Sequence, residues 1–125
     1  SDYVSFIGYF AQKSKSKLFF NNDILILPSY NEGLPYTVIE ALAAGLCIVC
    51  TDIGGMPEVV DKKGGAVFNV GDVNGMSKYI VNKSKNLSSF EGISSHNQNL
   101  ARDNYSISSN IKKIDSIYQD LLTVG

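Results

Sequence analysis

The chain of 125 residues has the length of one domain and is long enough to bury a hydrophobic core. Hydrophobic residues make up 44% and charged residues 18%, which excludes intrinsic disorder because enough apolar surface exists to offset chain ordering. The net charge of −1 argues against a general nucleic-acid-binding surface, and no apolar run reaches the roughly 18 residues of a transmembrane helix. Two cysteines exclude a disulfide-stapled secreted fold, so the expected location is cytoplasmic.

Apolar and polar stretches alternate along the chain as in an α/β protein. Strands are expected at residues 4–7, 23–27, 46–51 and 66–69. Helices are expected at residues 12–20, 36–44, 56–60, 72–85 and, after Ser106, 107–121. The pattern of the stretch 87–104 is unclear, with a helix expected near its end. The near-continuous apolar runs 23–27 and 46–51 predict strands buried on both faces. The fold class is therefore α/β, a Rossmann-like parallel sheet flanked by helices.

Ligands of parallel α/β sheets bind beyond the carboxyl ends of the strands. That rule points to the loops at residues 8–12, 28–36 and 52–56. The loop 28–36 is the richest in polar groups, because it leaves a buried strand at Pro28 and enters a helix at Tyr36.

The start of the helix at Tyr36 is a natural seat for a phosphate, since its backbone N–H groups are unpaired and carry partial positive charge. The candidate donors are the N–H groups of Leu34, Tyr36 and Thr37. Glu32 and Glu40 flank this seat, and carboxylates suit the hydroxyls of a sugar or ribose. From spacing alone, the alternative remains that Glu32 caps the helix and Glu40 is a solvated side chain.

The segment 28–45 reads P-S-Y-N-E-G-L-P-Y-T-V-I-E-A-L-A-A-G and resembles the E-x7-E signature of retaining GT-B glycosyltransferases of family 4. The resemblance extends to V-S-F-I-G at residues 4–8, I-V-C-T-D-I-G-G-M-P-E-V-V at 48–60, and G-G-A-V-F with a following G-D at 64–72. These stretches occur in the family's order, so the match is more specific than one isolated motif.

The resemblance implies a division of labour among the residues around the motif. Glu32 is the catalytic residue and accepts hydrogen bonds from donor-sugar hydroxyls. The other implied donor-binding residues are Gly33 and Leu34 near the sugar, Tyr36 and Thr37 at the diphosphate, Glu40 at the ribose, and Tyr9 and Phe10 at the base. The glycine pair at 54–55 lies in a turn at the same expected edge of the sheet. A purely structural role in that turn explains the pair at least as well as a role in donor binding.

The chain also departs from the family pattern, because neither a Gly-rich phosphate loop nor a basic pair after it is found. Residues 1–125 are therefore expected to form one partial nucleotide-sugar-binding domain, the C-terminal half of a GT-B fold truncated at its N-terminal side, with the acceptor domain missing. The expected function is donor binding by a hexosyltransferase-type enzyme that uses a UDP- or GDP-linked sugar in cell-surface polysaccharide or glycolipid synthesis. Alternatives are a non-catalytic folded fragment and a GT-B nucleotide-sugar epimerase. A fragment of this kind is expected to be inactive alone and to form a homodimer.

No metal or other cofactor is expected, because the chain has no D-x-D pair to hold a cation. Cys47 and Cys50 form a lone C-x-x-C inside an apolar strand and are interpreted as core residues, while His96 is interpreted as solvated surface. The lysines at 13, 15 and 17 are interpreted as a solvated face. The alternative for these lysines is contact with phosphate or with an anionic membrane surface, where the parent protein would be peripheral.

Overall fold

The computed structural model describes residues 3–8, 12–31, 36–105, 119 and 122. Within them, a three-stranded parallel sheet has the strand order β1-β2-β3 and is flanked by helices, which confirms the predicted α/β class. The elements in chain order are α1 (Gln12–Phe20), β1 (Ile24–Leu27), α2 (Tyr36–Ala43), β2 (Cys47–Thr51), α3 (Met56–Val59), β3 (Gly65–Phe68), α4 (Val73–Ser84) and α5 (Ser89–Tyr105).

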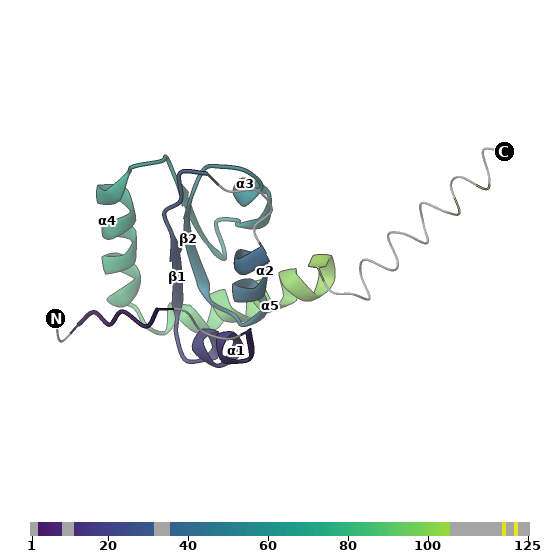
Figure 1. Cartoon of the computed structure of the whole chain (residues 1–125), viewed down its shortest axis with the longest axis horizontal. Helices are drawn as coiled ribbons and strands as arrows, with labels where there is room; N and C mark the ends of the chain where they lie inside the picture. The colour runs from purple at the N-terminus through teal and green to yellow at the C-terminus, as the bar shows by residue number, and fades with distance from the viewer. Residues whose placement is uncertain (1–2, 9–11, 32–35, 106–118, 120–121, 123–125) are drawn as a thin grey trace.

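The central strand β2 has all five residues buried, as its apolar run predicts. Alternate side chains of β2 serve the two faces of the sheet. Ile48 and Cys50 join the main core beside α2, whereas Cys47 faces Tyr79 of α4. Figure 1 shows the corresponding layers, with α4 on one side of the sheet and α2 and α3 on the other.

The outer strand β1 is less buried than its apolar sequence predicts. It pairs only with β2 among the described residues, with Ile24 opposite Cys47, and Ile26 remains 48% exposed. The prediction that this strand is buried on both faces is therefore wrong. An apolar run predicts a strand, but it does not reveal whether a second neighbour covers it.

The predicted strand at residues 4–7 is also wrong. These residues form no strand, and the side chains of Phe6 and Ile7 are exposed. A strand exists only where its backbone N–H and C=O groups find a partner ladder. Neither edge of the sheet pairs with this segment in the described part of the chain.

The helix α2 ends where its sequence predicts. Val38, Ala41 and Leu42 are its buried residues and form one apolar face against the sheet. Gly45 follows with a φ of 85°, a left-handed conformation that glycine adopts without strain. The Asp72 side chain caps α4 by accepting a hydrogen bond from the N–H of Gly75, as predicted.

The helix α5 covers most of the stretch that the sequence leaves unclear, and it packs against α2 and β2. The buried side chains of Ile93 and Ala101 hold α5 against the rest of the domain, and polar side chains of the helix contribute as well. His96 contradicts its predicted role as solvated surface, because it is half-buried and its Nε2 lies 2.8 Å from both carboxylate oxygens of Asp61. The helix predicted at residues 107–121 lies outside the described residues, apart from position 119.

Among the described residues, no helix is both long and apolar enough to cross a membrane. The longest, α5, has 17 residues and many polar side chains.

Candidate functional site

The carboxyl ends of the three strands lie at the upper edge of the sheet in Figure 1, where the loops toward α2, α3 and α4 begin. Two hydrogen bonds tie these loops together. The hydroxyl of Thr51, at the end of β2, donates to the backbone oxygen of Ser29 at 2.6 Å, and the N–H of Asp52 donates to the oxygen of Phe68 at 2.8 Å. The loop that leads into α2 therefore leaves the sheet from a fixed point.

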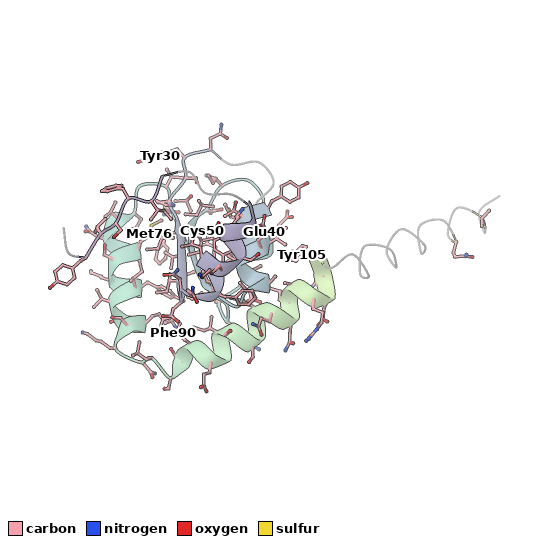
Figure 2. All side chains as sticks on the ribbon, turned by 60° about the horizontal axis from the view of Figure 1, so that its bottom comes forward. Tyr30, Glu40, Cys50, Met76, Phe90 and Tyr105 are labelled. Carbon is pink, nitrogen blue, oxygen red and sulfur yellow. The ribbon has the colours of Figure 1, made fainter. Side chains whose placement is uncertain are left out.

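Of the predicted site residues, three lie in the described part of the chain. Tyr36 is the first residue of α2 and is exposed, while Thr37 and Glu40 are half-buried on the same helix. The predicted residues Tyr9, Phe10, Glu32, Gly33 and Leu34 lie outside the described residues. Figure 2 shows Glu40 on the α2 ribbon and Tyr30 on the loop that follows β1.

The structure brings Thr37 and Glu40 together through Lys15, whose contacts with these two residues the sequence did not predict. The ammonium Nζ of Lys15, on α1, lies 3.2 and 3.3 Å from the two carboxylate oxygens of Glu40 and 3.4 Å from the hydroxyl of Thr37. The interpretation of Lys15 as part of a solvated face is wrong, because its side chain is only 17% exposed. The K-x-K-x-K pattern does not show which lysine faces inward, and 22 residues separate Lys15 from Thr37.

Two small cavities border this region. One of about 220 Å³ lies between α1 and α2 and is lined in part by Ser16, Phe20 and Glu40. The other, of about 230 Å³, lies at the strand ends and is lined in part by Tyr30 and Asp72. Each is below the roughly 300 Å³ at which ligand pockets usually begin. They offer room for part of a ligand that also contacts other surfaces.

Cys47 and Cys50 are buried, free thiols, as the core interpretation predicts. Burial raises the pKa of both, and that of Cys50 reaches about 11, with the nearby charge of Asp52 adding to the effect. Thiols of this kind are protonated at neutral pH and are poor nucleophiles and metal ligands. No cluster of three or more histidine, cysteine or acidic side chains that could hold a metal ion occurs within the described residues.

Comparison with known proteins assigns this arrangement to a family. Residues 1–89 match the family model described as glycosyl transferases group 1. The chain belongs to this family. The start of α2, with Thr37 and Glu40, lies within the matched segment.

The fold agrees with that assignment. Sucrose-phosphate synthase from Thermosynechococcus elongatus, a GT-B glycosyltransferase, superimposes with a TM-score of 0.84 at 18% identity, over 99% of this chain and 31% of the synthase. At that identity the similarity establishes the fold. The prediction of a Rossmann-like α/β domain of GT-B type is thereby confirmed.

Two relatives show the range of transferases to which the chain is similar. N-acetyl-alpha-D-glucosaminyl L-malate synthase of Bacillus anthracis is 25% identical over 122 residues, which are 97% of this chain and 32% of the synthase. O-antigen chain mannosyltransferase B of Escherichia coli is 28% identical over 79 residues, 63% of this chain and 20% of that enzyme. The chain therefore spans no more than about a third of the length of these two relatives.

Proposed function

We propose that the chain forms the donor-binding region of a retaining family 4 glycosyltransferase that uses a nucleotide-linked sugar. The observation that carries the proposal is the placement of Thr37 and Glu40 on the first turns of α2, within a segment that matches the glycosyl transferases group 1 family. In this proposal, N–H groups and hydroxyls at the helix start hold the diphosphate, and the Glu40 carboxylate accepts hydrogen bonds from ribose hydroxyls.

The proposal gives Glu32 a different task from Glu40. Glu32 accepts hydrogen bonds from the sugar itself and acts at the reacting centre, beside the N–H groups of Gly33 and Leu34, while Tyr36 and Thr37 contact the diphosphate. Tyr9 and Phe10 contact the base. The acceptor belongs to a cell-surface polysaccharide or glycolipid, a role that the similarity to an O-antigen chain mannosyltransferase supports. Such an enzyme would work in the cytoplasm, peripheral to the membrane.

Replacing Glu40 with glutamine tests the division of labour. Glu40→Gln should weaken binding of free UDP or GDP by the purified chain about 5-fold to 150-fold, the value of a hydrogen bond to a charged group. Glu32→Gln should leave free nucleotide binding nearly unchanged and weaken binding of the nucleotide-sugar. Titrations followed by NMR would measure both affinities, even when they are in the high-micromolar range.

Glu91→Gln is a matched control, because Glu91 is an exposed carboxylate in the first turn of α5. It should bind nucleotide like the unmodified chain. Equal loss of free nucleotide binding in Glu32→Gln and Glu40→Gln would reject the assigned roles. Absence of any nucleotide binding by the unmodified chain would reject the proposed function for this chain.

The proposal also assigns no metal to the donor site. The departing diphosphate would be stabilised by helix N–H groups and basic side chains. Sugar transfer by an enzyme containing this chain should then survive an excess of EDTA, measured as product formed with and without the chelator. A strict requirement for Mg²⁺ or Mn²⁺ would contradict this mode of donor binding.

Self-association of the chain is a further part of the proposal. The strand β1 pairs only with β2 among the described residues, and Ile26 on it is half-exposed. The side chains of Phe6 and Ile7 are exposed as well. Unpaired strand edges and exposed apolar side chains favour pairing with a second copy. Light scattering should report a dimer, and an assay of sugar transfer should find this dimer inactive. A chain that stays monomeric at all concentrations would contradict the proposed self-association.

A further inference from the structure

Lys15 is held in place from several sides. Its ammonium group contacts both carboxylate oxygens of Glu40 and the hydroxyl of Thr37, and it lies 5.7 Å from the centre of the Phe19 ring. An ammonium group at that distance from an aromatic ring gains a cation–π attraction. A side chain with these contacts and only 17% exposure is confined to few conformations.

Lys17, two residues further along α1, offers the contrast. It is exposed, as expected of a lysine on the outward side of an amphipathic helix. The two lysines therefore share a helix and a charge but differ in environment, and only Lys15 approaches the functional end of α2.

A carboxylate has about four sites at which it can accept hydrogen bonds, two on each oxygen. A carboxylate that accepts a hydrogen bond from an ammonium group can therefore accept hydrogen bonds from other donors as well. A carboxylate also accepts stronger hydrogen bonds than an amide. Fixing the carboxylate before the ligand arrives reduces the conformational entropy lost on binding.

We propose that Lys15 is a positioning residue of the donor site, which fixes the Glu40 carboxylate in the arrangement that receives the ribose hydroxyls. This inference rests on the proposed function of Glu40. Lys15 acts through Glu40 and does not itself contact the nucleotide. Removing its charge therefore weakens recognition of the ribose and leaves the attraction for phosphate nearly intact.

Four single lysine variants of the purified chain and one double variant test this role. Lys15→Met removes the charge but keeps an apolar stem to pack on Phe19, and Lys15→Arg keeps the charge. Lys17→Met removes one charge from the exposed side of the same helix and is the matched control. Lys15→Met is also combined with Glu40→Gln. Lys15→Gln, measured in parallel, keeps the test decisive if the methionine variant does not fold.

The probes are UDP or GDP, whichever binds more tightly, its 2′,3′-dideoxy analogue, and inorganic pyrophosphate, each titrated by NMR. Lys15→Met should weaken nucleotide binding about 3-fold to 10-fold, with a much smaller effect on the dideoxy analogue and on pyrophosphate. Lys15→Arg should restore most of the affinity, and Lys17→Met should bind like the unmodified chain. In the Glu40→Gln background, Lys15→Met should have no further effect.

The other outcomes separate this inference from the proposed function. Equal losses for nucleotide and pyrophosphate would mean that Lys15 contacts phosphate directly, which overturns the positioning role. The positioning role would also be overturned if Lys15→Met left nucleotide binding unchanged. It would be overturned as well if the effects of Lys15→Met and Glu40→Gln on nucleotide binding simply added in the double variant. Absence of nucleotide binding by the unmodified chain would overturn the proposed function, and this inference with it.

Discussion

Gly65→Ala should lower the free energy of unfolding by about 3 kcal/mol, at the upper end of the usual effect of overpacking. Gly65 begins β3 and is the register partner of Ile48 on β2. A Cβ atom at this position would overlap the backbone carbonyl of Ile48. Because the obstacle is the backbone of the fully buried central strand, no side-chain movement can relieve the overlap. Urea denaturation followed by circular dichroism would measure the change.

Gly92→Ala provides the control for this prediction. Gly92 lies inside α5, and a Cβ atom there would meet nothing within 4 Å. Alanine in an exposed helical position is favoured over glycine by roughly 0.5–1 kcal/mol, so this variant should be more stable than the unmodified chain. Equal behaviour of the two variants would show that the close approach of β3 to β2 is not tight enough to exclude a methyl group.

The parts of the fold that were predictable are those in which a local pattern determines the outcome. The apolar run of β2 identifies a buried strand, and the apolar face of α2 followed by Gly45 identifies a helix and its end. These patterns need no information about distant residues. The segment 4–7, wrongly predicted as a strand, is also mostly apolar. Whether it forms a strand depends on a pairing partner, which sequence periodicity does not identify.

The site residues remain predictions, and the structure describes three of them. Tyr36, Thr37 and Glu40 were proposed from their place after an apolar run and at the start of a helix, and from the resemblance of the motif to a family. The contacts of Lys15 with Thr37 and Glu40 were not predicted, because they join residues 22 and 25 positions apart, on two helices whose packing the sequence does not specify. The residues around Lys15 in α1 are also mostly polar, which is typical of a helix face exposed to solvent.

The helix α5 was hard to predict for a related reason. Its stripe of buried residues is short, and one member, Asn97, is polar. An asparagine in a stretch of serine, asparagine and glutamine is typical of a surface loop, yet Asn97 is fully buried. Its partners are backbone groups 33 and 51 residues away, which no local pattern reveals.

Asn97→Leu should lower the free energy of unfolding by about 2–4 kcal/mol, although leucine is similar in size and more hydrophobic. The Nδ2 group of Asn97 donates hydrogen bonds to the backbone oxygens of Leu46 at 2.7 Å and Gly64 at 2.9 Å. These bonds fasten α5 to the entrance of β2 and to the turn before β3. Leucine cannot donate, and a buried carbonyl that loses a partner is costly. Denaturant unfolding would measure the loss, and Asn99→Leu, at an exposed position of the same helix, should change stability by less than about 0.5 kcal/mol.

Asn97→Asp extends this prediction to pH. The new carboxyl group would be buried against two carbonyl oxygens, so its protonated form, which can donate one hydrogen bond, is favoured in the folded state. Its pKa would then be higher in the folded chain than the roughly 3.9 of an unfolded aspartate. Stability relative to the unmodified chain should therefore be greatest below about pH 4 and fall as the pH rises toward neutrality. A stability difference that does not vary with pH, measured by urea denaturation between acidic and neutral buffers, would show that this side chain reaches water and is not the buried fastening of α5.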